Sequence, residues 1–351
     1  MTNITFIIGN GFDINLGMKT QYANVYDGYI ATPSSNDNIA AFKNSLKADR
    51  MCRYKLWSDF EMGMGEFAQS FESENAFIEC VRDFKAYMVQ HLRNEQARFT
   101  QQWKDDISFL RSYAKFFEDS VLGYSNNLIP NAKRAIEKAA RLRPIHYSFI
   151  TFNYTAILDY FIQYYNQSMY DPTLIYNFSD PIHLHGHLNG DVVVGVDNEQ
   201  QINNGFELTM RGRRAFIKPK INQDYDQGRV DEAKKVISES NIICVYGLSL
   251  GQSDLTWTIA LKEWLQQDNT HHLIYNYYDL TQYPQYHNDL LLEVEDSRKE
   301  EILGRMQFAD SQIQSVFDQV HIPVGANMFD TRRIPWPTRR AQVASPPVGV
   351  R

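Results

Sequence analysis

Residues 4–13 of the chain read ITFIIGNGFD, and this stretch decides the fold. An apolar run that stops at a Gly-Asn-Gly turn is typical of a fully buried strand, and a helix can begin from Ile14 onward. Glycines in such a turn let the backbone approach a phosphate, and the helix N-terminus adds a partial positive charge. The stretch does not complete the dinucleotide fingerprint of dehydrogenases, because Ile14 occupies the third glycine position. We therefore predict a strand–turn–helix ligand site and disfavour a hydride-transfer enzyme.

Strand and helix patterns alternate along much of the remaining chain. Strand patterns return at residues 146–152, 174–178, 181–186, 191–196, 242–246 and 272–278. Strands that alternate with helices imply a mostly parallel sheet covered by helices on both faces. Between the first and second strands lie long amphipathic helical patterns. We predict an α/β core over residues 1–30 plus 141–325, a helical insertion over residues 31–140, and an irregular, basic, proline-containing tail over residues 326–351.

The composition excludes several classes of protein. The 351 residues carry 35 basic and 42 acidic side chains, a net charge of −7, whereas a general nucleic-acid binder needs a basic excess. No apolar run approaches the ~20 residues of a membrane span, and the N-terminus lacks the features of a secretory signal. The three cysteines lie far apart, which excludes a disulfide scaffold and a zinc ribbon. We expect a cytoplasmic globular protein that binds neither nucleic acid nor membrane.

Four polar clusters follow predicted strands, at the edge where ligands bind in an open α/β sheet. They are residues 9–13, 151–155, 183–187 and 247–254. Asn153 can cap the helix that follows it, and its amide could equally hold a ribose hydroxyl or a water, since it both donates and accepts hydrogen bonds. Asp13 and Asp254 have the same two interpretations, as helix caps or as ligand contacts. Four clusters at one structural position favour a single binding crevice.

The third cluster contains three alternating histidines, His183, His185 and His187. On a strand all three would point to one face. Solvated surface imidazoles are one interpretation and metal ligation is another, because neutral imidazole is a common metal ligand, although no HExxH motif accompanies the run. A third interpretation makes His185 a general base. It directly precedes Gly186, where the strand is expected to end, and could take a proton from water or a ribose hydroxyl.

A shorter motif lies in the helical insertion, where residues 57–61 read WSDFE. Ser58 followed three residues later by Glu61 has the spacing of a helix capping box. A carboxylate that points into a pocket is the alternative interpretation of Glu61.

Taken in this order, the motifs resemble the AbiH-type bacteriophage abortive-infection proteins. The residues that carry the resemblance are 7–13, Gly17, 20–22, 57–61, 151–155, 185–186 and 194–197. More distantly, the same order is similar to sirtuin-like NAD-binding domains, in which a Gly-x-Gly turn, an Asn, a His-Gly pair and a Gly-x-Ser strand end follow one another. The resemblance implies a Rossmann-like (sirtuin-like) α/β fold with a mostly parallel sheet, helices on both faces and a large helical insertion.

The resemblance also implies roles for individual residues. Asn153 would orient the ribose and the attacking water, and His185 would be the catalytic histidine. Protein deacylation is not expected, because the zinc-binding cysteines of deacylating sirtuins have no counterpart, and no metal ligands are implied. Substrate contacts are implied for Gly9, Asn10, Gly11, Phe12, Asp13, Thr20, Gly186, Asp197, Ser249 and Asp254.

We therefore expect an antiphage defence protein that hydrolyses NAD at the nicotinamide–ribose bond, with NAD as substrate and no tightly bound cofactor. The leaving nicotinamide is already cationic, so one histidine and one asparagine could suffice where ordinary glycosidases use two carboxylates. A metal-dependent hydrolase or nuclease that uses the His183, His185 and His187 run is one alternative. A non-catalytic module that senses a nucleotide or phage is another. We also expect a homo-oligomer, and a phage-derived trigger or partner defence protein.

Overall fold

A computed structural model describes residues 2–51, 59–103, 106–113, 117, 128, 130–140, 144–169, 176–277, 281, 288–324 and 328–329. Among these residues, seven strands form one sheet in the order β3-β2-β1-β5-β6-β7, with the short β4 also paired to β2. Every one of these pairings is parallel, as predicted. The strands are β1 (Thr2–Ile8), β2 (Ile145–Thr151), β3 (Tyr176–Phe178), β4 (Ile182–His183), β5 (Ile242–Tyr246), β6 (His272–Asn276) and β7 (Val320–His321).

The first strand, β1, lies in the middle of the sheet, between β2 and β5. Ile4, Phe6 and Ile8 are buried in a cluster on one face of the sheet, and Ile7 is buried in a cluster on the other. A strand buried on both faces cannot alternate apolar and polar residues, which explains its almost continuous apolar sequence. The stretch that opens the sequence therefore forms the centre of the fold.

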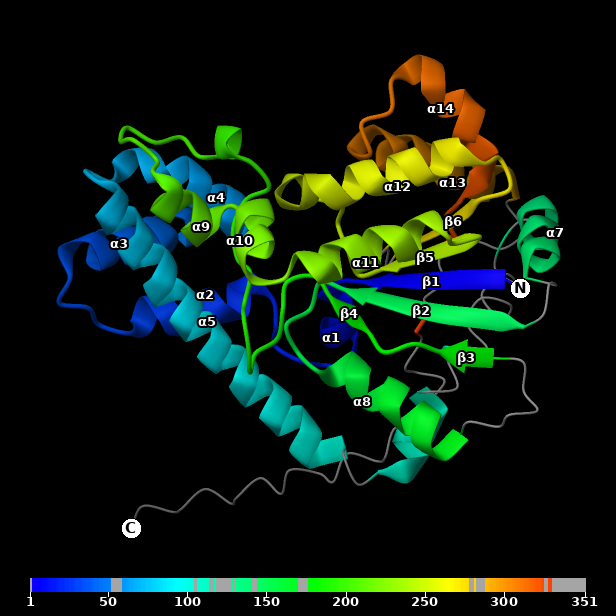
Figure 1. Cartoon of the computed structure of the whole chain (residues 1–351), viewed down its shortest axis with the longest axis horizontal. Helices are drawn as coiled ribbons and strands as arrows, with labels where there is room; N and C mark the ends of the chain where they lie inside the picture. The colour runs from blue at the N-terminus through cyan, green and yellow to red at the C-terminus, as the bar shows by residue number, and fades with distance from the viewer. Residues whose placement is uncertain are drawn as a thin grey trace, which may run out of the picture.

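Helices cover both faces of the sheet (Figure 1). One face packs against α1 (Gly11–Asn15), α7 (Pro130–Ala139), α8 (Ile157–Tyr164) and the end of α5 (Glu74–Trp103) in a cluster rich in aromatic rings. The other face packs against α11 (Gln227–Ser238), α12 (Leu255–Gln267), α13 (Asn288–Arg305) and α14 (Asp310–Val316). Within the described residues, no helix combines the length and apolar character that crossing a bilayer requires.

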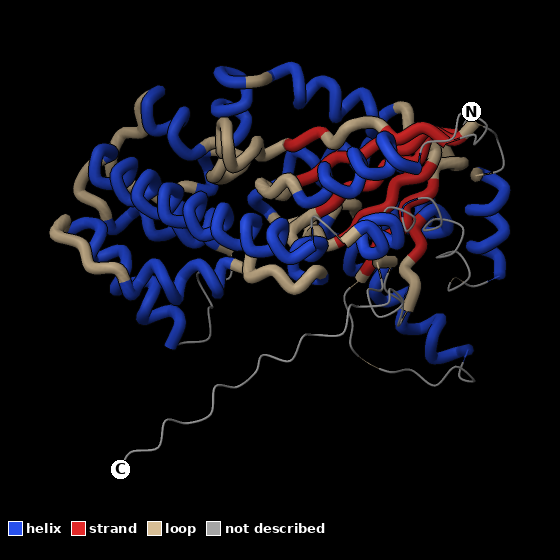
Figure 2. The backbone as a smooth tube through the Cα atoms, turned by 90° about the horizontal axis from the view of Figure 1, so that it is seen from below, coloured by secondary structure: helices blue, strands red, loops and turns tan. Residues whose placement is uncertain are grey.

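A group of helices beyond one end of the sheet, which we call the cap, has a hydrophobic cluster of its own. Figure 2 shows the strands gathered at one end of the molecule and only helices and loops at the other. The cap comprises α2 (Tyr22–Ala31), α3 (Asp37–Met51), α4 (Phe60–Phe67), most of α5, and residues 188–217, which include α9 (Met210–Phe216). Residues from before β2 and from after β4 thus share one core. The predicted domain bounds stay a prediction.

The strand order places a ligand-binding position at the middle of the sheet. From β1 the chain builds β2 and β3 outward in one direction and then β5, β6 and β7 in the other, the order of Rossmann-like sheets. The predicted fold class is therefore confirmed. Where the order reverses, the turns after β1 and β5 touch, and a Cβ on Gly247 (φ +67°) would lie 2.6 Å from the Cα of Gly11. Only glycine at both positions permits this approach.

Of two strands predicted from apolar patterns, the one at residues 181–186 is shorter than predicted and the one at residues 191–196 is wrong. The run of alternating histidines is not a strand, because β4 ends at His183 and the chain turns at once. Gly186, with φ +75°, lies in this turn, where a Cβ would overlap the carbonyl oxygen of Asp191. Residues 191–196 make only isolated bridges, through Val192 and Val196, within the described part of the chain. Val192, Val194 and Val196 pack into the core of the cap instead of joining the sheet.

Some predictions fall wholly or partly outside the described residues. Trp57 and Ser58, the start of the predicted capping box, are outside them, and Asp59 caps α4 through its side chain. Of the predicted tail, the structure describes Met328 and Phe329, which are buried in the aromatic cluster beneath the sheet.

Candidate active site

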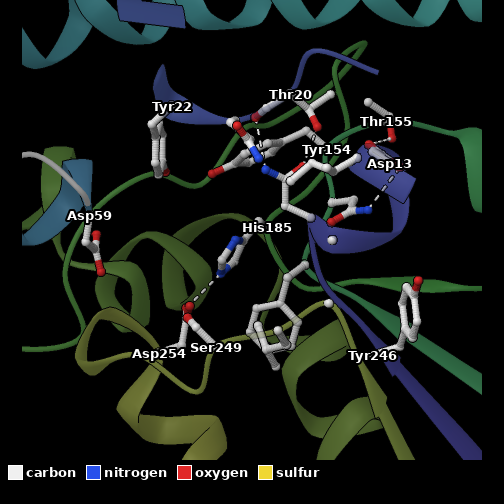
Figure 3. Close-up of a pocket in the computed structure, with 18 of the residues that line it drawn as sticks. Asp13, Thr20, Tyr22, Asp59, Tyr154, Thr155, His185, Tyr246, Ser249 and Asp254 are labelled. Atoms are coloured by element: carbon white, nitrogen blue, oxygen red, sulfur yellow. Dashed lines mark hydrogen bonds and ion pairs between the residues drawn. The ribbon is translucent and has the colours of Figure 1, made fainter. Parts of the chain in front are cut away.

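A cavity of about 850 Å³ lies between the strand ends and the cap (Figure 3). Its floor comes from the turns after β1, β2, β5 and β6, and its roof from α2, α4 and α5. This size suits a small-molecule or cofactor site. Eight of the predicted site residues line it, namely Asn10, Gly11, Asp13, Thr20, Asn153, His185, Ser249 and Asp254.

Asn153 is held by a buried carboxylate. Its Nδ2 donates to Oδ1 of Asp13 at 3.1 Å, and the hydroxyl of Thr155 donates to the other oxygen of Asp13 at 2.6 Å. Because a carboxylate only accepts hydrogen bonds, Asp13 fixes the side-chain amide of Asn153 with its NH₂ group toward Asp13. Oδ1 of Asn153 is buried and has no hydrogen-bond partner among the described residues. A buried acceptor without a donor costs free energy, so a hydroxyl or a water that reached this oxygen would relieve that cost.

Asp13 makes stability depend on pH. Burial raises the pKa of Asp13 from 3.8 to about 6, although the hydrogen bonds from Thr155 and Asn153 oppose this. A carboxyl whose pKa is raised on folding gives stability that is complete below about pH 4 and is lost as the pH rises to about 6. Across this window we expect wild type to lose up to about 3 kcal/mol of unfolding free energy relative to Asp13→Asn. Urea unfolding between about pH 4 and pH 7 measures this, and a pH-independent difference would contradict it.

His185 lies at the centre of the cavity, with Asp254 on one side and Tyr154 on the other (Figure 3). Its Nε2 is 3.1 Å from Oδ1 of Asp254, and the same oxygen is 2.7 Å from Nζ of Lys218, the first residue of α10 (Lys218–Tyr225). Nζ of Lys218 is also 2.8 Å from Oε2 of Glu61. Glu61, Lys218, Asp254 and His185, which we call the ion cluster, therefore connect a cap helix to the carboxyl edge of the sheet.

The charges in the ion cluster fix the state of His185. Burial and the Lys218 ammonium lower the pKa of His185 below its ordinary value, although Asp254 opposes both. Burial alone would raise the pKa of Asp254, but Lys218 and His185 hold it well below its usual range. At neutral pH, Asp254 is thus a carboxylate and His185 a neutral imidazole. Nε2 must carry the ring proton to donate to Asp254, so Nδ1 has a lone pair, and no described residue hydrogen-bonds to it.

The other two histidines of the run have different surroundings. Nδ1 of His183 is 3.0 Å from the carbonyl oxygen of Asn153, and its Nε2 is 2.9 Å from Oδ2 of Asp159. The ring of His187 lies against that of His183, with 3.9 Å between their centroids. Both nitrogens of His183 are used and His185 contacts Asp254, so the three imidazoles do not converge on one point. No other group of His, Cys, Asp or Glu in the described chain could hold a metal ion either.

The glycine turn after β1 is bound to the turn after β5. The N–H of Gly9 donates to the carbonyl of Tyr246 at 2.8 Å, and the N–H of Gly11 donates to that of Gly247 at 3.0 Å. These two amides are therefore used within the protein. The close approach of the two turns, and not a ring of free amides, is what the glycines provide here.

The remaining predicted site residues either line the wall of the cavity or lie behind that wall and hold its loops in place. Asn10 and Thr20 bond each other twice, at 3.0 and 2.6 Å, and so tie the turn after β1 to the loop before α2. Phe12 is buried in the aromatic cluster. Gly186 turns the chain after His185, and the carboxylate of Asp197 accepts a backbone N–H from the first turn of α12. Gly9, Phe12, Gly186 and Asp197 do not line the cavity.

Lys218 carried no prediction from the sequence, and Glu61 carried two, a helix capping box and, as the alternative, a carboxylate that points into a pocket. The structure supports the alternative for Glu61. Glu61 is buried, lines the cavity, and accepts the N–H of Gly195 at 3.1 Å through its second oxygen. The N-cap residue of helix α4 is Asp59, whose side chain accepts the backbone N–H of Glu61 at 3.0 Å. A lysine directly after the apolar residues Phe216 and Ile217 was the one available signal.

These features define a Rossmann-like α/β protein with a nucleotide-sized pocket where the strand order reverses. The chain belongs to the AbiH family of bacteriophage abortive-infection proteins, whose family model matches residues 5–277. The match extends from β1 to the end of β6 and includes the whole ion cluster. None of the curated proteins matches the chain. The protein therefore acts in phage defence by abortive infection, as its motifs predict.

Proposed function

We propose that the protein hydrolyses NAD at the nicotinamide–ribose bond, and that this loss of NAD aborts the phage infection. One arrangement carries the proposal: a neutral His185 with a lone pair on Nδ1 and an unpaired acceptor on Asn153 line the same cavity. A base and a hydroxyl-binding group in one enclosed site are what hydrolysis of a ribosyl bond requires.

The reaction breaks the bond between C1 of the ribose and the pyridinium nitrogen. The bonding electron pair leaves with nicotinamide, which becomes neutral, so no acid has to protonate it. The oxygen of a water then bonds to C1, and a proton of that water passes to Nδ1 of His185. Asp254 stabilises the imidazolium that forms, and the proton returns to solvent after ADP-ribose departs.

Asn153 orients the reacting ribose. Its Oδ1 accepts from a ribose hydroxyl or from the attacking water, and Asp13 prevents the amide from rotating. Holding both reactants in place lowers the barrier without further chemistry from the protein. In this proposal Asp13 does not contact the reacting atoms, and it positions Asn153 and Thr155 through its two carboxylate oxygens.

The test follows NAD in bacteria that express the protein during phage infection, because we propose that a phage product triggers the activity. We expect NAD to fall and nicotinamide and ADP-ribose to rise, as measured by mass spectrometry. His185→Ala and Asn153→Ala should each slow nicotinamide release about 10²-fold or more. The control is His146→Ala, a histidine near the amino end of β2 that does not line the cavity. If all variants release nicotinamide as fast as wild type, the assignment is wrong.

Measurements on the purified protein, together with the NAD levels in infected cells, separate the two alternatives. Thermal stabilisation of the purified protein by NAD, with unchanged NAD in infected cells, would indicate a module that only binds the nucleotide. Activity that disappears with a chelator and returns with one equivalent of metal would indicate the metal-dependent hydrolase.

A further inference from the structure

Lys218 uses all three protons of its ammonium group inside the protein. Nζ lies 2.7 Å from Oδ1 of Asp254, 2.8 Å from Oε2 of Glu61 and 3.0 Å from the carbonyl oxygen of Ser253. The residue is 4% exposed, so water does not replace these contacts. A buried cation with three acceptors has one position, and it holds its acceptors in one position as well.

Of these acceptors, Asp254 is the partner of His185. One oxygen, Oδ1, receives both the Nζ of Lys218 and the Nε2 of His185. Glu61 holds Lys218 from the side of the cap, and the N–H of Gly195 holds the second oxygen of Glu61. A chain of contacts therefore runs from the cap through Lys218 to the imidazole that faces the cavity.

We propose that Lys218 is a positioning residue of this site: it fixes Asp254 as the acceptor for Nε2–H of His185 and so leaves Nδ1 as the basic nitrogen. Glu61 supports it by fixing Lys218. The inference rests on the proposed function in one respect, namely that the basic nitrogen of His185 serves NAD hydrolysis. The arrangement of the four side chains is a property of the folded protein without substrate.

The charges around His185 give this role a measurable signature. Asp254 favours the imidazolium, whereas Lys218 and Arg229 of α11 oppose it. The other near neighbours, Phe152 and Tyr154, present rings at 5.1 and 5.9 Å between centroids. Removal of the Lys218 charge should therefore raise the pKa of His185, by about 1 pH unit or more, and let the ring proton move between the two nitrogens.

The experiment is a ¹⁵N NMR titration of the histidines in the full-length protein, with the His185 signals assigned from their absence in His185→Gln. Lys218→Met alone leaves two buried acid groups without a cation, and burial raises the pKa of Glu61 to about 7 even with Lys218 present, so the key variant is the double change Lys218→Met with Glu61→Gln. Lys220→Met, two residues further along α10 and exposed, is the matched control. We expect wild type and the control to show the Nε2–H tautomer with a low pKa, and the double variant to show a higher pKa and mixed tautomers. An unchanged tautomer and pKa would overturn the proposal.

An activity measurement distinguishes this proposal from the proposed function. The acid limb of the pH profile of nicotinamide release should move to higher pH in the double variant, while Lys218→Arg, which keeps the charge, should retain the wild-type profile. Altered NMR behaviour together with no NAD hydrolysis by wild type would support the positioning role and overturn the reaction. If wild type hydrolyses NAD, and the double variant loses hydrolysis while its His185 signals stay unaltered, the reaction is supported and the positioning role of Lys218 is overturned.

Discussion

Replacement of Lys218 by methionine is expected to lower the free energy of unfolding by about 3–5 kcal/mol. Methionine has nearly the length of lysine, so the change removes the charge and little volume. Glu61 and Asp254 would then both lie buried without the cation that they share. Burial already raises the pKa of Glu61 to about 7 although Lys218 opposes this, so Glu61 would become a neutral acid in the variant and Asp254 would keep an unpaired charge. Urea unfolding at neutral pH measures the loss.

The same two variants that serve the titration control this measurement. Lys220→Met changes an exposed residue of the same helix and should stay within about 0.5 kcal/mol of wild type. Addition of Glu61→Gln to Lys218→Met replaces one of the two buried acid groups by a neutral amide and should recover part of the loss. Lys218→Met as stable as wild type would show that the buried ion cluster contributes nothing to folding.

Alanine at position 247 is expected to destabilise the fold by about 2–5 kcal/mol. Gly247 has φ +67°, where a Cβ costs about 1–2 kcal/mol by itself. That Cβ would also lie 2.6 Å from the Cα of Gly11 and 2.8 Å from the N of Phe12, and both are backbone atoms at the centre of the sheet. Because neither can shift alone, β1 and β5 would have to separate. Thermal or urea unfolding of Gly247→Ala measures the effect.

Two other glycines separate the contributions to this loss. Gly17 has φ +79° with no atom near its missing Cβ, so Gly17→Ala should show the conformational cost alone. Gly190 has open space and no positive φ, so Gly190→Ala should be close to neutral. If Gly247→Ala costs no more than Gly17→Ala, the two turns do not approach as closely as described.

The sheet and the floor of the cavity could be predicted because the evidence for them is local. Residues 4–13 contain both the buried strand and its glycine turn, so pattern alone indicates a central strand. Parallel strands bring their carboxyl ends to one edge, which is why Asn153, His185 and Asp254 line one cavity although they are far apart in sequence.

The ion cluster could not be predicted because its members share no local pattern. Lys218 and Glu61 are 157 residues apart, and they meet only because residues 188–217 fold into the cap. The histidine run failed for the opposite reason: alternation over five residues is also compatible with a turn, and Gly186 made one. The roof of the cavity, which the cap helices form, and the burial of Glu61 also depend on this packing between distant parts of the chain.

One helix joins the cap to the sheet without interruption. The thirty residues of α5 measure about 45 Å, and they include no proline or glycine at which the helix could bend. Phe77 and Phe84 anchor it in the cap, while Phe99 and Trp103 anchor it among the rings beneath β1. The two halves of the molecule cannot swing about this connection as a hinge would allow. Because Met88 and Leu92 of the same helix line the cavity, a displacement of the cap relative to the sheet would alter the cavity wall as well.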